Sequence, residues 1–207
     1  NQKTAIKTAI ENGVTVITGG PGTGKTTIIK ALIEIFQEHG VGVLLCAPTG
    51  RAAKRISETS GYEAKTVHRL LEVGYEIGQE DRAYFSRNEE NPLDADVIIM
   101  DEASMIDIVI LSSLLKAMKP GTRLILVGDA DQLPSVGPGN VLSDIIESGE
   151  VPVVKLDKIF RQSEESMIIV NAHRINQGME PILNTEEGDF YFIPRLDPGE
   201  TVEAVIE

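Results

Sequence analysis

The 207-residue sequence predicts an α/β three-layer sandwich built on a mainly parallel sheet. Short apolar runs suited to buried strands alternate along the chain with segments of helical periodicity. The run at 41–47 is apolar except for Gly42, as expected for a strand that is covered on both faces. The first apolar run leads through a glycine-rich loop directly into a helical pattern. Together these three observations are typical of a parallel sheet with helices packed on both sides.

The individual elements follow from the same patterns. The expected strands are 14–18, 41–47, 97–100, 124–127 and 151–156. The expected helices are about 2–11, 25–39, 50–60, 66–71 and 108–118. In the last of these helices we expect Ile108, Leu111, Leu115 and Met118 to share one apolar face.

Two regions break the alternation. Residues 72–96 are polar and too long for a plain connection, which predicts a small inserted hairpin or loop. From about Asn171 the character changes again, with a strand-like stretch at 189–194 and a helical start at 198–207. We therefore expect a domain over 1–170 that carries an insert at about 72–96. Residues 171–207 would begin a second domain of a longer protein.

Composition limits the function classes. The net charge of −13 argues against binding a polyanion over the whole surface. Between residues 50 and 70, however, five basic residues outnumber two acidic ones, which indicates either a local basic track or a solvated helix face. The single cysteine, Cys46, excludes an intramolecular disulfide, and a reducing, cytoplasmic setting is expected. No apolar run approaches the roughly 18 residues of a membrane span.

Residues 19–27 form a complete P-loop motif, G-x-x-x-x-G-K-[ST], between an apolar strand and a helix. Glycines allow backbone N–H groups to approach a phosphate, and the helix directs its positive end at the same anion. Lys25 can reach the β- and γ-phosphates, and Thr26 can ligate Mg²⁺. An ordinary glycine-rich turn is the alternative, but the spacing and the context favour a nucleoside triphosphate site. Its expected contacts are Gly20, Pro21, Gly22, Thr23, Gly24, Lys25, Thr26 and Thr27.

Two adjacent carboxylates end the apolar strand at 97–100. Asp101 is expected to hold the metal shell opposite Thr26. The next side chain diverges from it, so Glu102 is expected to orient and deprotonate the attacking water. Acidic residues that decorate a helix N-terminus are the alternative reading.

Two further segments follow later strands. Gln132 lies in the loop after the strand at 124–127, where its amide can bond the γ-phosphate or the water. Arg161 follows the strand at 151–156, where its guanidinium can stabilise charge on the transferred phosphoryl group. A plain turn and a surface arginine are the respective alternatives.

The motifs together resemble those of superfamily 1 DNA helicases, in particular the RecD-like, five-prime-to-three-prime branch. The resemblance rests on 19–27, 47–53, Thr66-Val67-His68-Arg69-Leu70-Leu71, Asp101-Glu102-Ala103-Ser104-Met105, 128–134 and 160–162. It implies a RecA-like motor domain that hydrolyses ATP with Mg²⁺, in which Gln2 reads the adenine edge. It also implies a single-stranded DNA path lined by Pro48, Thr49, Arg51, Thr66 and His68. Hydroxyls and arginine suit a motor that grips the backbone rather than the bases.

The resemblance also implies partners and rivals. A helicase of this branch needs a second RecA-like domain, whose later motifs are not found in these 207 residues. We therefore expect the chain alone to be weak or inactive as a motor. A nucleotide-binding regulatory module without unwinding activity stays open as an alternative. A phosphotransferase is disfavoured because no arginine-bearing acceptor lid is evident.

Overall fold

The computed structural model describes residues 1–75, 83–158, 166–183, 188–195 and 197–206. The chain divides into two compact units, residues 1–158 and 159–207. The first unit holds a six-stranded sheet in the order β3-β2-β6-β7-β1-β8, in which every neighbouring pair is parallel. The strands are β1 (Val14–Gly19), β2 (Val43–Ala47), β3 (Ala64–Thr66), β6 (Val97–Met100), β7 (Arg123–Gly128) and β8 (Val153–Leu156).

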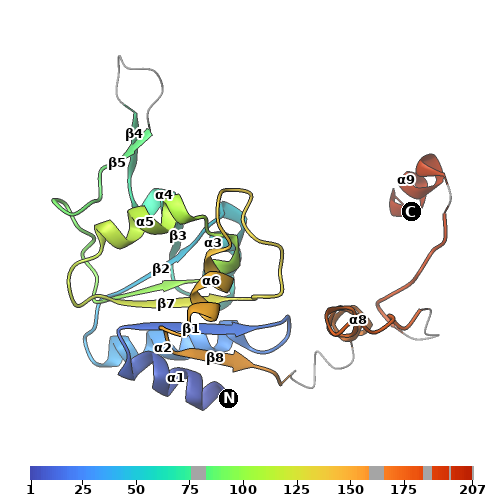
Figure 1. Ribbon diagram of the computed structural model, residues 1–207, viewed down its shortest axis with the longest axis horizontal. Coiled ribbons are helices and arrows are strands. Elements are labelled where there is room, and N and C mark those ends of the chain that lie inside the picture. The colour runs from blue at the N-terminus through green and yellow to red at the C-terminus, as the bar shows by residue number, and fades with distance from the viewer. Residues whose placement is uncertain (76–82, 159–165, 184–187, 196, 207) are drawn as a thin grey trace. The chain divides into compact units, whose positions relative to one another are not determined.

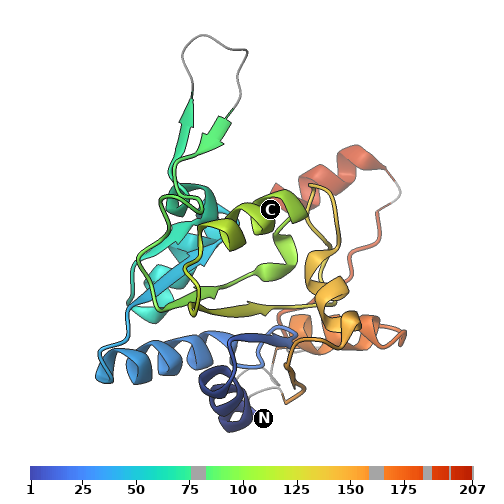
Figure 2. The same ribbon diagram turned by 60° about the vertical axis from the view of Figure 1, so that its left-hand side comes forward.

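Helices cover both faces of this sheet (Figures 1 and 2). On one face the core is formed with α1 (Gln2–Glu11), α2 (Lys25–Glu38) and α3 (Gly50–Ser60). On the other face it is formed with α4 (Val67–Leu70), η1 (Ala103–Met105), α5 (Ile108–Ala117) and α6 (Val141–Ser148). The predicted three-layer α/β sandwich is confirmed.

Strand alternation explains how one sheet supplies two cores. In β6, Ile98 and Met100 join the α5 side, whereas Val97 and Ile99 join the α2 side. Successive side chains of a strand point to opposite faces, so an uninterrupted apolar run fills both layers. All four of these β6 side chains are fully buried.

The insert between Leu71 and the β6 strand contains an antiparallel hairpin of β4 (Val73–Tyr75) and β5 (Ala83–Phe85). Figure 1 shows this pair extending away from the main sheet beyond α4. At its base, Arg87 Nη2 donates to Glu72 Oε1 at 2.8 Å, and the backbone N–H of Ser86 donates to the Glu72 carbonyl at 3.1 Å. The expected inserted hairpin is therefore present.

Two local expectations for this unit differ from the structure. On α5, Ile108, Leu111, Leu115 and Met118 line one hollow and so share a face as predicted, but this is not the most buried face: Leu111, Leu114 and Ala117 are buried, while Ile108 and Leu115 are about half exposed. β3 was not predicted, because the sequence Ala-Lys-Thr carries no strand signal of its own. It forms as an edge strand beside β2, with Ala64 opposite Leu45.

The second unit contains α8 (Met167–Asn176) and α9 (Pro198–Ile206). Buried Asn171 ties α8 to the following segment, donating to the Ile182 carbonyl at 2.8 Å and accepting from its N–H at 2.7 Å. The strand expected at 189–194 is wrong, because these residues form no strand. Whether residues 171–207 begin a second RecA-like domain stays a prediction. No helix within the described ranges is long and apolar enough to span a bilayer.

Candidate functional site

The glycine-rich loop lies between the end of β1 and the start of α2. Gly22 and Gly24 have φ values of +75° and +86°, in the left-handed region that favours glycine. Gly19 passes so close to β8 that an added Cβ would lie 2.7 Å from the Leu156 carbonyl oxygen. The loop therefore needs glycines for two separate reasons, a left-handed turn and a close approach of two backbones.

Lys25 is directed into this loop. Its Nζ donates to the carbonyl oxygens of Gly19 at 2.5 Å and Gly20 at 3.0 Å. Thr23 Oγ1 donates to the same Gly20 carbonyl at 2.8 Å. Burial lowers the pKa of Lys25, and the charges of three carboxylates oppose that shift. They are, in order of effect, Asp129, Glu102 and Asp101.

Asp101 directly follows β6, and its backbone N–H donates to the Cys46 carbonyl of β2 at 2.9 Å. Burial, and then the neighbouring charge of Glu102, raise the pKa of Asp101 to about 6. Lys25 acts in the opposite direction. A cation at this carboxylate would relieve the same cost, which is the behaviour expected of a metal-shell residue.

Glu102 has a left-handed backbone, with φ at +52°, which is uncommon for a residue other than glycine. One carboxylate oxygen, Oε1, lies 3.3 Å from Nη1 of Arg55 on α3. The other oxygen, Oε2, is buried and has no hydrogen-bond partner among the residues that the structure describes. Strained backbone and an unsatisfied buried oxygen are both features that gather at functional sites.

The loop after β7 is fastened to the P-loop strand. The backbone N–H of Ala130 donates to Thr18 Oγ1 of β1 at 3.1 Å. Asp129 is 4% exposed, and its carboxylate accepts from the N–H of Asp131 at 3.1 Å. The Gln132 side chain is exposed, and its backbone N–H donates to the Asp129 carbonyl at 3.2 Å. The γ-phosphate role of Gln132 therefore stays a prediction.

The start of α1 lies near the P-loop. Asn1 Nδ2 donates to the Lys155 carbonyl at 3.3 Å, which places Asn1 beside β8. Because Gly19 also packs on β8, the N-terminus of α1 and the P-loop share one neighbour. The amide Nε2 of Gln2 is buried and finds no acceptor within the described part of the chain. A buried donor without an acceptor suits a ligand with ring-nitrogen acceptors, such as adenine.

Three of the five predicted DNA-path residues meet in one hollow of about 250 Å³. Its lining combines Pro48, Thr49 and His68 with residues 105–107, Ile110 and 134–137. Thr49 Oγ1 also caps α3, accepting from the Ala52 N–H at 3.2 Å.

The other two predicted DNA-path residues, Arg51 and Thr66, are not among the lining residues. Arg51 is exposed on the first turn of α3, and Thr66 Oγ1 caps α4 by accepting from the Arg69 N–H at 3.1 Å. The structure thus gives both threonines a helix-capping role, and their contact with DNA stays a prediction.

Sequence reasoning gave no role to two residues that the structure places in the site. Asp129 was seen only as part of a turn, although its position at a strand end beside Gly128 was a usable signal. Arg55 was counted only among the basic residues of its helix. The remaining predicted catalytic residue, Arg161, lies outside the described residues.

The chain that carries this P-loop, the strand-end carboxylates and the loop after β7 is similar to known proteins. A family model described as an AAA domain matches residues 2–138. The chain belongs to this family. Among curated proteins, it is 43% identical over 166 residues to the ATP-dependent RecD2 DNA helicase of Deinococcus radiodurans, covering 80% of the chain and 22% of the relative. It is 35% identical over 234 residues to the RecBCD enzyme subunit RecD of Mycobacterium tuberculosis, covering 99% and 40% respectively.

Solved structures agree with the fold of this AAA domain. Unliganded Pif1 from Bacteroides sp. matches with a TM-score of 0.55 and 28% identity, over 84% of this chain and 44% of that one. Pif1 helicase from Candida albicans matches with a TM-score of 0.62 and 24% identity, over 87% and 44%. The predicted RecD-like superfamily 1 motor domain is confirmed. The chain spans less than half the length of each of these four relatives.

Proposed function

We propose that the chain is the first motor domain of an ATP-dependent DNA helicase that moves five-prime to three-prime on single-stranded DNA. The observation that carries this proposal is the setting of Lys25 in the P-loop, where the Gly19 and Gly20 carbonyls hold its ammonium group and the charges of Asp129, Glu102 and Asp101 act on it. A lysine that is buried among carboxylates and held by loop carbonyls is suited to exchange those partners for phosphate oxygens. The relatives named RecD2 DNA helicase and RecD support the link to DNA.

Each residue of the proposed site would have its own role in ATP binding or hydrolysis. The loop glycines and Lys25 would hold the phosphates, and Gln2 would donate to the adenine. Thr26 and Asp101 would hold Mg²⁺, which neutralises charge on the phosphate oxygens. Glu102 would accept a proton from the attacking water through its unpaired oxygen. Gln132 would sense the γ-phosphate, and Arg161 would supply a cation to the transition state.

Single-stranded DNA is the proposed substrate of the face that holds the hollow beside Thr49 and His68. The remaining contacts would come from a second RecA-like domain of the same protein. Translocation needs two DNA contacts, one on each domain, that bind in alternation as the cleft opens and closes. The cytoplasmic setting, inferred from the single cysteine, belongs to the same proposal.

The proposal is tested on the full-length protein with ATP, Mg²⁺ and oligonucleotides. We expect single-stranded DNA to stimulate ATP hydrolysis, and a duplex with a five-prime tail to be unwound in preference to one with a three-prime tail. Lys25→Ala is the control and should lose both activities. ATP binding without any hydrolysis or unwinding would favour the regulatory module instead.

A further inference from the structure

Arg55 contacts the proposed general base, although it lies 47 residues away in the sequence. Its Nη1 lies 3.3 Å from Glu102 Oε1, while Glu102 Oε2 is buried and pairs with none of the described residues. The Glu102 side chain is 15% exposed, whereas that of Arg55 is 71% exposed. The arginine thus approaches an enclosed carboxylate from the solvent side and holds only one of its two oxygens.

The Arg55–Glu102 ion pair contributes little to the stability of the fold. Ion pairs with one solvent-exposed partner contribute weakly to folding, because water competes and a long side chain loses freedom. Orientation is a different matter, since a carboxylate with one oxygen fixed presents the other in a defined direction. The left-handed backbone of Glu102 shows that its direction is also set by local strain.

Arg55 is carried by the helix that bears part of the expected DNA path. Arg51 precedes it by one helical turn, so the two side chains leave the same face of α3. Thr49, which lines the hollow, caps the same helix. Buried Ala53 and Ile56 pack the helix against the core, so Arg51 and Arg55 are held in a fixed relation to one another.

We propose that Arg55 is a positioning residue that orients Glu102 toward the attacking water and links it to the DNA face of α3. The inference rests on the proposed function, because it assigns Glu102 as the base and α3 as a DNA contact. Pairing by Arg55 is the state that supports hydrolysis, and single-stranded DNA on α3 favours that state. Binding free energy at one site is in this way coupled to chemistry at the other.

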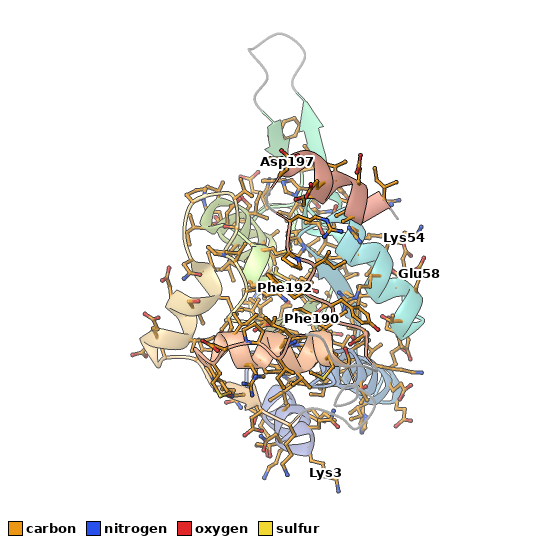
Figure 3. The ribbon with its side chains drawn as sticks, turned by 90° about the vertical axis from the view of Figure 1, so that its right-hand side faces the viewer. Lys3, Lys54, Glu58, Phe190, Phe192 and Asp197 are labelled. Atoms are coloured by element: carbon orange, nitrogen blue, oxygen red, sulfur yellow. The ribbon has the colours of Figure 1, made fainter. Side chains whose placement is uncertain are left out.

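The test compares Arg55→Ala, Arg55→Lys and the control Lys54→Ala in the full-length protein. Lys54 neighbours Arg55 on α3, and it forms an ion pair with Glu58 of the same helix, at 3.9 Å. Figure 3 shows Lys54 and Glu58 on the outer side of this helix. ATP hydrolysis is measured with and without oligo-dT, together with the KM for ATP, the Kd for oligo-dT and the melting temperature.

We expect Arg55→Ala to lower the DNA-stimulated kcat by at least about fivefold, the lower end of typical coupling between two sites. The KM for ATP and the melting temperature should stay unchanged, and the Kd for oligo-dT should rise by no more than the same factor, because the coupling is reciprocal. Arg55→Lys should restore part of the stimulation, and Lys54→Ala should behave as wild type. A merely structural role would not separate kcat from these other quantities.

Three results would overturn the inference. They are wild-type stimulation in Arg55→Ala, an equal loss in Lys54→Ala, and a loss confined to DNA affinity, which would make Arg55 a plain phosphate contact. Absence of stimulation in the wild-type protein is distinguishable from all three, because it would count against the proposed function itself.

Discussion

Thr18 and Ala130 are joined by a hydrogen bond of 3.1 Å, in which the Ala130 backbone donates to the threonine hydroxyl. The bond links the end of β1, just before the P-loop, to the loop that carries Asp129 and Gln132. Two segments 112 residues apart in the sequence are thereby held at the same edge of the sheet. The contact fixes the position of the Gln132 loop relative to the strand that leads into the P-loop.

Replacing Thr18 with valine should separate these two loops while it preserves shape. The Ala130 N–H would lose its acceptor, so we expect the free energy of unfolding to fall by about 1–2 kcal/mol. Urea denaturation measures this loss, and ATP hydrolysis should also fall. Thr15→Val is the matched control, because the Thr15 hydroxyl on the same strand donates to the Thr8 carbonyl at 3.4 Å, away from the site. Equal ATPase rates in both variants would contradict a role for the Thr18 contact.

Replacing Glu102 with glutamine removes the base and keeps the side chain's size. We expect hydrolysis in the full-length protein to fall by roughly 10²–10⁴-fold, the usual contribution of general base catalysis. Binding of a fluorescent ATP analogue should persist, since the phosphates are held by the P-loop. A parallel loss of binding and hydrolysis would indicate that Glu102 shapes the site rather than acting in the reaction.

Replacing Arg51 with alanine should weaken binding to single-stranded DNA. One fewer phosphate contact should reduce the slope of log affinity against log salt by roughly 0.7. Hydrolysis of ATP without DNA should barely change, because Arg51 is exposed on α3 and contacts no described site residue. Lys54→Ala is the control on the same helix. An unchanged salt slope would assign Arg51 to an ordinary solvated helix face.

Asp101 should make the nucleotide-free protein depend on pH. The pKa of Asp101 is raised to about 6 in the folded chain, so folding takes up a proton between about pH 4 and 6. Stability is therefore greatest below that window and is lost as the pH rises through it. Neutral Asp101→Asn should escape this cost and be about 1–3 kcal/mol more stable than wild type at pH 7, with the difference vanishing near pH 4.

Chemical denaturation across this pH range, without nucleotide or Mg²⁺, checks the prediction for Asp101. Asp144→Asn is the control, since it neutralises an exposed carboxylate on α6. A constant difference between Asp101→Asn and wild type from pH 4 to 7 would show that the substitution acts through packing rather than ionisation.

Local patterns were sufficient for much of this protein. Uninterrupted apolar runs such as 97–100 predict buried strands, because a strand covered on both faces cannot alternate with polar residues. The P-loop could be placed because its glycines and lysine act within one short segment. The helix over residues 2–11 and the inserted hairpin also follow from periodicity and length.

Tertiary structure alone decided the features that depend on distant partners. The sequence Ala64-Lys65-Thr66 becomes a strand only because β2 offers an edge for it to pair with. In α5 the apolar residues lie all round the helix, so the choice of Leu114 over Leu115 for burial depends on how the helix meets the sheet. The Arg55–Glu102 and Thr18–Ala130 contacts join residues 47 and 112 positions apart. Sequence periodicity gives information only about residues within a few helical turns of one another. Folding brings the carboxyl ends of the parallel strands to one edge of the sheet, and the site residues come together there.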